Sequence, residues 1–260
     1  MKTRIISSFL MLLVFIPILL LGGTYYTIFG SILGIMSLYE MHRLDNDTPK
    51  YVKIINYLIC LILILHNVFV SDKRYLFLVF GLIFLWFAIS IVINKDIKKY
   101  NYKNLVFLLA TTLIIGILYN SFVEVRLIGL IPTIYCFLVS IATDTFAYLG
   151  GRVFGEHKLS ISISPNKTIE GSIIGSIFGT IIGSIFYYNI IGNTNLWLII
   201  LTSLILTILA QIGDLFFSGI KRSYDIKDFS NLIPGHGGIL DRLDSVLFVI
   251  LGFLIYNLFI

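Results

Sequence analysis

The chain alternates between long blocks of apolar residues and short polar connections. The blocks run for about 17–25 residues, the length that an α-helix needs to cross about 30 Å of hydrocarbon. A helix that is apolar on every side over this length is typical of a membrane span and not of a soluble surface. We therefore predict an all-α, polytopic integral membrane protein with about nine transmembrane helices. The predicted spans are 5–21, 25–39, 54–70, 75–93, 104–119, 127–149, 171–191, 196–213 and 244–260.

The first span raises the question of a signal peptide, because it follows the positively charged Lys2 and Arg4. It is longer than the apolar region of a typical signal peptide, and no A-x-A cleavage pattern follows it. We therefore expect this span to be retained as a helix.

Composition supports the membrane class. The 260 residues are 58% hydrophobic and 13% charged, whereas soluble domains carry about 25% charged residues. Basic loops beside a membrane explain the net charge of +5, so we expect no nucleic-acid partner. Cys60 and Cys136 lie inside apolar spans, and we interpret them as small buried hydrophobes, without a disulfide or metal framework.

The distribution of positive charge predicts the orientation. With nine spans, successive loops lie on alternate sides, and one side receives sixteen Lys and Arg residues. The other side receives three, namely Lys73, Arg74 and Arg126. Because loops rich in Lys and Arg remain in the cytoplasm, we predict a cytoplasmic N-terminus and a C-terminus on the far side.

We expect two regions along the chain. Residues 1–125 form an N-terminal region of about five spans, and residues 126–260 form a C-terminal region of about four spans. Two connections in the second region, 150–170 and 214–243, are long and rich in Gly, Pro and charge, and both fall on the predicted cytoplasmic side. Loops of this kind carry function more often than short connections do.

One short repeat marks the span 171–191. Glycines recur every four residues, each followed by Ser or Thr, which makes one helix face almost flat and allows another helix to approach closely. We interpret this face as internal helix packing, and a homodimer seam is the alternative. The repeat consists of Gly171, Gly175, Gly179 and Gly183, with Ser172, Ser176, Thr180 and Ser184.

Four acidic residues lie at the predicted cytoplasmic edge of the membrane: Asp144, Asp214, Asp241 and Asp244. Ionisable groups at this depth are costly, so they are functional candidates by default. Asp241 and Asp244 are three residues apart and share one helix face. A single acid such as Asp241 would also suit a helix cap, but that explanation is weaker for four acids together.

A basic and glycine-rich stretch lies between Asp214 and Asp241. Glycines allow backbone N–H groups to approach an oxyanion, Lys and Arg contact phosphates, and carboxylates supply the oxygen ligands that Mg²⁺ prefers. These ingredients indicate metal-assisted phosphoryl or nucleotidyl transfer, although similar residues also line ion transporters. The sequence has no G-x-x-x-x-G-K-[ST] phosphate loop and no kinase glycine loop.

At this stretch the chain resembles the phosphatidate cytidylyltransferase family. Residues 218–244 match the family pattern S-x-x-K-R, four residues, K-D, then P-G-H-G-G-x-x-D-R-x-D. Residues 164–171 resemble its S-P-x-K-T-x-E-G segment, residues 144–152 its D-T-x-A-Y-x-x-G-[RK] segment, and 211–214 its Q-x-G-D segment. The motifs cover about the last 120 residues. Asn166 is a mild departure, where the family often has a basic or small residue.

The resemblance implies an enzyme that condenses CTP with phosphatidic acid to give CDP-diacylglycerol and pyrophosphate. It assigns Asp214 and Asp241 to a divalent metal, expected to be a paired Mg²⁺ site, with a monovalent cation as an alternative component. His236 is expected to orient phosphate in the glycine-rich loop. The remaining phosphate, hydroxyl and polar contacts implied by the family are Lys221, Arg222, Lys227, Lys167, Ser218, Ser164, Asp144, Asp228, Glu170, Gly237, Gly238 and Asp244.

The expected partners are CTP, phosphatidic acid and the bilayer, with the site on the cytoplasmic side of a multi-pass protein in the inner (cytoplasmic) membrane. Two other classes share some of these features. One is a CTP-dependent polyprenol or phytol kinase, against which the intact P-G-H-G-G-x-x-D-R-x-D stretch argues. The other is a secondary transporter, which would place similar acids near the midplane of both halves, whereas the first half here is almost free of them.

Overall fold

The computed structural model describes residues 2–45, 47–69, 73–93, 101–191 and 195–258. The regular elements of this part of the chain are helices apart from one short hairpin, which confirms the all-α prediction at the level of fold class. The helices are α1 (Lys2–Leu21), α2 (Gly23–His42), α3 (Lys50–Phe69), α4 (Lys73–Val92), α5 (Tyr102–Ile128), α6 (Leu130–Phe154), α7 (Ile169–Ile191), α8 (Leu196–Ser223) and α9 (Leu240–Asn257). The hairpin consists of β1 (Lys158–Ser160) and β2 (Ser164–Thr168).

Four of the described helices, α5 to α8, are each long and apolar enough to cross a membrane. Large apolar side chains also point outward from α1, α6 and α7, as with Ile5, Ile141 and Ile181. Outward apolar side chains on so many helices fit contact with lipid. Lys95, Lys98 and Lys99, which contribute to the charge bias, lie outside the described residues, as do residue 70 of the third predicted span and residues 259–260 of the last.

The chain forms two compact units. One, residues 21–124, contains α2 to α4 and most of α5. The other, which we call the catalytic unit, contains α1 up to Leu20 and the chain from Val125 onward. The first helix therefore packs with the C-terminal region, although more than one hundred residues separate them in the sequence.

The first unit is held by close helix contacts and one buried polar pair. Gly34 of α2 allows this approach, since a Cβ there would lie 3.1 Å from the ring of Tyr119 on α5. The Tyr119 hydroxyl is 2.6 Å from the Ser37 hydroxyl, so the buried phenol has a partner. Apolar side chains of α3, α4 and α5, including Leu63 and Leu108, complete a core.

In the catalytic unit, the glycine face of α7 packs against α6. A Cβ on Gly175 would lie 2.7 Å from the carbonyl oxygen of Thr143, and one on Gly171 would lie 2.6 Å from that of Ala147. The two backbones are therefore closer than any side chain would permit, as small-residue packing in membranes requires. The interpretation of this face as internal helix packing is confirmed.

The Ser/Thr positions of α7 turn toward α8 instead. Gln211 of α8 donates to the Ser176 hydroxyl at 2.8 Å and to the Ser172 carbonyl at 3.3 Å, and it accepts from the Ser172 hydroxyl. Hydrogen bonds between helices inside a membrane fix their register. The contact of Gln211 with α7 therefore fixes where Asp214, three residues further along α8, lies relative to α7.

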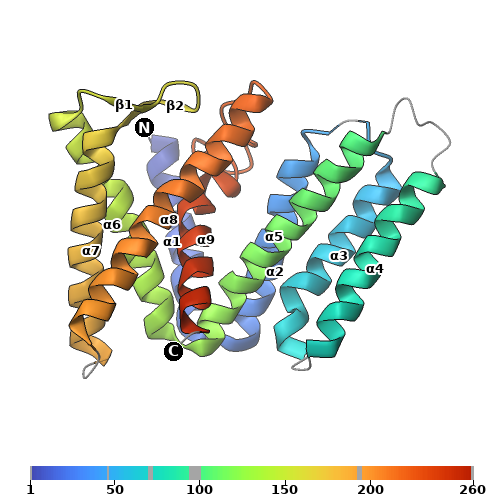
Figure 1. The fold of residues 1–260 in the computed structure, drawn as a ribbon, viewed down its shortest axis with the longest axis horizontal. Coiled ribbons are helices and arrows are strands. Elements are labelled where there is room, and N and C mark those ends of the chain that lie inside the picture. Colours follow the sequence, from blue (N-terminus) through green and yellow to red (C-terminus); the bar gives the residue numbers. More distant parts are fainter. Residues whose placement is uncertain (1, 46, 70–72, 94–100, 192–194, 259–260) are drawn as a thin grey trace. The chain divides into compact units, whose positions relative to one another are not determined.

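Helix α8 continues to Ser223, ten residues beyond the predicted end of its span. Ser218, Lys221 and Arg222 therefore lie on a helix, and the irregular connection to α9 is only 224–239. The sequence pattern placed the end at Asp214, the first charge, but the buried Phe217 continues the apolar face beyond it. Within the catalytic unit, the hairpin, the start of α1, the end of α8 and the start of α9 share one end (Figure 1).

Candidate active site

A cavity of about 770 Å³ opens at this end of the catalytic unit. Helices α6, α7, α8 and α9, the strand β2 and the connection 224–239 all contribute to its lining. The predicted site residues that line it are Asp144, Lys167, Asp214, Lys221, Asp228, Asp241 and Asp244. The structure thus brings seven residues from four separate motifs to one space.

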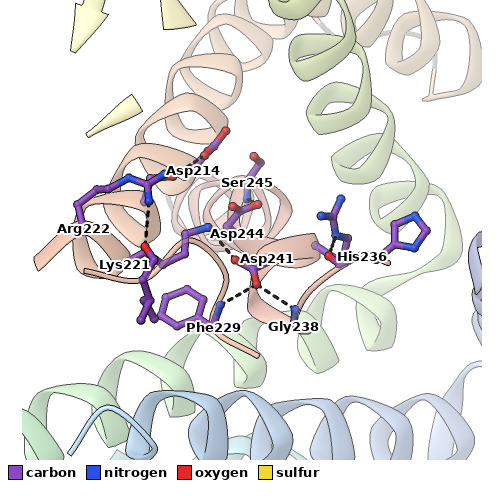
Figure 2. A network of polar contacts seen from close by, with 12 residues as sticks. Asp214, Lys221, Arg222, Phe229, His236, Gly238, Asp241, Asp244 and Ser245 are labelled. Carbon is purple, nitrogen blue, oxygen red and sulfur yellow. Dashed lines mark hydrogen bonds and ion pairs between the residues drawn. The ribbon is translucent and has the colours of Figure 1, made fainter. Parts of the chain in front are cut away.

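Asp241 organises the connection between α8 and α9. Its Oδ2 accepts hydrogen bonds from the backbone N–H groups of Phe229 and Gly238, both at 2.9 Å, and its Oδ1 lies 2.7 Å from Lys221 Nζ (Figure 2). The Asp241 side chain is only 3% exposed. This one carboxylate links two residues of the connection, Phe229 and Gly238, to Lys221 of α8. Its negative charge strengthens all three contacts and so fixes the fold of the connection.

The segment 233–237 forms a tight turn next to Asp241. Ile233 N–H donates to the Gly237 carbonyl and His236 N–H donates to the Ile233 carbonyl, both at 2.9 Å. Gly237 has φ of 87°, which favours glycine. A Cβ there would also lie 3.0 Å from Asp241 Oδ2, so this glycine allows the backbone to reach the carboxylate.

Asp214 joins the hairpin to α8. Its Oδ2 forms an ion pair with Lys167 of β2, and its Oδ1 accepts from the Ser218 hydroxyl at 3.1 Å. The Asp214 and Lys167 side chains are 26% and 30% exposed. This pair is therefore more open to the cavity than the pair of Lys221 and Asp241.

Two further acids lie beside Asp214. Asp244 Oδ1 accepts from the backbone N–H of Ser245 at 2.9 Å, and the Ser245 hydroxyl is hydrogen-bonded to Asp144. Asp144, Asp214 and Asp244 are near enough for their negative charges to repel one another. Ionised together, these carboxylates would need cations in the cavity.

The charge of the cavity lining favours a bound cation. Five carboxylates and four basic side chains line the cavity, so oxygen ligands are available to a cation and basic groups are available to phosphates. The described residues contain no group of three acidic, His or Cys side chains arranged as a metal site. Mg²⁺ does not require such a group, since one or two carboxylates commonly hold it together with substrate phosphates. The carboxylates present fit that kind of binding.

Several predicted residues have other positions. Glu170 accepts from the backbone N–H groups of Glu156 and His157 and closes the base of the hairpin. Arg222 donates to the Ile163 and Ile226 carbonyls, which joins the hairpin turn to the connection after α8. Among the described residues, the predicted ones that do not line the cavity are Ser164, Glu170, Ser218, Arg222, Lys227, His236, Gly237 and Gly238.

The cavity also includes side chains that our sequence reasoning did not assign. Tyr148 and Arg152 lie four and eight residues after Asp144, and this helical spacing was a usable signal for one shared face. Within the described chain, Arg152 has no hydrogen bond or ion pair to another residue, so its guanidinium is available to a ligand. The other polar side chains of this kind are Asn166, Thr168, Ser172, Gln211, Arg242 and Ser245.

Comparison with known proteins agrees with the motifs. A sequence model of the cytidylyltransferase family matches residues 2–260. A phosphatidate cytidylyltransferase of Staphylococcus haemolyticus (strain JCSC1435) is 37% identical over 250 residues, covering 96% of both chains. The phosphatidate cytidylyltransferase of Staphylococcus aureus (strain COL) is 36% identical over 252 residues, with the same coverage of both chains.

Proposed function

The chain belongs to the cytidylyltransferase family, and we propose that it condenses CTP with phosphatidic acid to form CDP-diacylglycerol and pyrophosphate. The observation that carries this proposal is the similarity to proteins named phosphatidate cytidylyltransferase over 96% of both chains. The polar cavity at one end of apolar helices supports it, because one substrate is a lipid and the other is a soluble nucleotide.

The proposed reaction is an in-line substitution. An oxygen of the lipid phosphate forms a bond to the α-phosphorus of CTP, and the bond from that phosphorus to the β-phosphate oxygen breaks, releasing pyrophosphate. The lipid phosphate is already an anion, so no strong general base is required. The work of the protein is to hold two polyanions together, and Lys167, Lys221 and Arg152 are the cavity cations that suit this task.

We propose Asp214 and Asp241 as the residues that would hold divalent metal, as the family resemblance implies. Asp214 offers the more open carboxylate, with 26% of its side chain exposed against 3% for Asp241. In the structure the ammonium groups of Lys167 and Lys221 stand beside these two acids. A bound Mg²⁺ would supply neutralisation of phosphate charge, and a monovalent cation is the alternative second occupant.

We further propose nine crossings, with the site and the N-terminus in the cytoplasm of a cell with an inner (cytoplasmic) membrane. The excess of Lys and Arg on one set of predicted loops supports this orientation. Phosphatidic acid would then reach the cavity laterally from the leaflet, and CTP would reach it from the cytosol. The glycine face of α7 is covered by α6, so a homodimer, if formed, uses another surface.

The position of a radioactive label in CTP tests the reaction class. Purified protein in phosphatidic acid vesicles with Mg²⁺ should transfer label from α-labelled CTP to lipid and release label from γ-labelled CTP as pyrophosphate. A lipid kinase would instead transfer the γ-label, to a polyprenol or phytol included in a parallel vesicle. Transfer of neither label to any lipid would contradict the enzyme assignment and leave the transporter class.

A further inference from the structure

The imidazole of His236 is fully occupied by helix α1. Its Nδ1 lies 2.8 Å from the Ser7 hydroxyl and its Nε2 lies 3.0 Å from the Ser8 hydroxyl. Ser7 also donates to the Pro234 carbonyl at 3.0 Å. These contacts join positions 227 to 229 residues apart in the sequence.

The hydrogen atoms can be assigned to all three bonds together. If Ser7 donates to the Pro234 carbonyl, it accepts from Nδ1–H of His236. A neutral imidazole with its proton on Nδ1 then accepts from the Ser8 hydroxyl at Nε2. Both ring nitrogens are used in this arrangement, so neither is left to contact a phosphate.

The backbone of the same turn is held from the opposite direction by α9. Arg242 Nε donates to the His236 carbonyl at 2.8 Å, and Asp241 accepts from Gly238 N–H at 2.9 Å. Figure 2 shows the His236 ring pointing away from the cluster of Lys221 and Asp241. The turn is thus fixed between α9, which holds its backbone, and α1, which holds its side chain.

Among the side chains of α1 that the structure describes, from Ile5 onward, only Ser7 and Ser8 are polar. Neighbouring side chains, such as Ile5 and Phe9, are 70% and 63% exposed and apolar. A hydroxyl in such surroundings is costly without a partner, and Ser7 and Ser8 find theirs on one turn of the catalytic unit. Farther along α1, the ring of Phe15 packs at a tilt against that of Phe137, with centroids 5.1 Å apart, so the helix stays within this unit.

We propose that His236 is a positioning residue, through which Ser7 and Ser8 of α1 hold the turn 233–238 in place for Asp241. The inference rests on the proposed function for its activity readout. It assigns to the first helix a role in the active site, in addition to its proposed role as a membrane span. It also replaces the expectation that His236 contacts phosphate directly.

A double-mutant cycle tests the proposal. We would compare Ser7→Ala/Ser8→Ala, His236→Ala and the variant that combines them, measuring kcat and KM for CTP in lipid vesicles. If His236 acts only through the two hydroxyls, the combined variant loses no more kcat than Ser7→Ala/Ser8→Ala alone. His236→Ala loses the same fold or less, because it keeps the bond from Ser7 to the Pro234 carbonyl. If His236 touches the substrate, His236→Ala loses much more than the serine variant and the losses multiply, which would overturn the proposal.

Two controls separate this result from misfolding. Ser7→Thr/Ser8→Thr keeps both hydroxyls and should retain most of the kcat. Ser31→Ala removes a hydroxyl that, among the described residues, bonds only to the Thr27 carbonyl of its own helix, and it should leave kcat unchanged. Loss of kcat in the Thr variant equal to that in the Ala variant would contradict a role for the hydroxyls.

A second readout does not depend on the activity. Diethyl pyrocarbonate modifies imidazole nitrogens, and mass spectrometry of the peptide containing His236 gives its rate of modification. The rate should rise several-fold in Ser7→Ala/Ser8→Ala and stay at the wild-type value in Ser31→Ala. An unchanged rate would overturn the inference even if the protein makes CDP-diacylglycerol. If the modification rate rises in the serine variant but the wild-type protein makes no CDP-diacylglycerol, the inferred contact is supported and the proposed function is contradicted instead.

Discussion

Lys221 and Asp241 form an ion pair with Nζ 2.7 Å from Oδ1, although their side chains are only 10% and 3% exposed. Removal of one partner from a charge pair buried to this extent strongly destabilises the folded protein, because the other charge is left without compensation. Asp241 also accepts hydrogen bonds from the backbone N–H groups of Phe229 and Gly238. Stability and site geometry are therefore linked through one carboxylate.

We expect Asp241→Asn to lower both turnover and thermal stability. The change leaves Lys221 buried without its counter-charge, and breaking a buried pair typically costs about 3–5 kcal/mol. The amide also offers one acceptor oxygen in place of two, so it cannot hold Lys221 and both N–H groups as before. CDP-diacylglycerol formation and thermal unfolding in detergent measure the two effects.

A second substitution separates these effects. Asp241→Asn combined with Lys221→Met removes both charges, and it should recover part of the unfolding temperature without recovering turnover. A wild-type unfolding temperature in the single Asp241→Asn variant would show that the pair does not stabilise the protein.

Asp214→Asn should behave differently, since this side chain is 26% exposed and faces the cavity. We expect turnover to fall by about 10²–10³, the usual loss when one key electrostatic contact is removed, with little change in unfolding temperature. Turnover would be measured against Mg²⁺ concentration, and excess Mg²⁺ should not restore it.

The matched control for this variant is Asp225→Asn. Asp225 is exposed, does not line the cavity and has φ of 54°, a conformation that Asn tolerates well. Equal, near-normal turnover in the Asp214 and Asp225 variants would contradict the metal assignment, and Asp214 would then be a partner of Lys167 only.

Much of this arrangement was predictable from local sequence. The apolar blocks located the helices, and seven of the site residues predicted from the motifs line one cavity. The pattern does not predict the continuation of α8 beyond Asp214, because a span is expected to end at its first charged residue. The contact of Ser7 with His236 had no local signal, since it depends on which helices pack together over 229 residues of sequence.

Gly175→Leu should prevent stable folding of the catalytic unit. Even a Cβ at this position would lie 2.7 Å from the Thr143 carbonyl oxygen and from Ala147 Cβ, and backbone atoms cannot move aside without separating α7 from α6. Gly81→Leu is the control, because a Cβ at Gly81 meets nothing within 4 Å. Size-exclusion chromatography of both variants measures the effect, and equal monodisperse yield would show that α6 and α7 do not need this close contact.

Arg152→Ala should weaken binding of CTP without unfolding the protein. The Arg152 side chain is exposed at the last turn of α6 and lines the cavity, and it bonds to no other residue in the described chain, so its removal breaks no internal contact. One hydrogen bond to a charged group contributes about 1.5–3 kcal/mol, so we expect KM for CTP to rise by roughly 10-fold or more.

Arg152→Lys should recover part of this affinity, because it keeps the charge but loses the planar fork. Arg43→Ala, an exposed arginine in the other unit, should leave KM unchanged. Initial rates at varied CTP and fixed phosphatidic acid measure the change, and a rise confined to the KM for phosphatidic acid would assign Arg152 to the lipid phosphate instead.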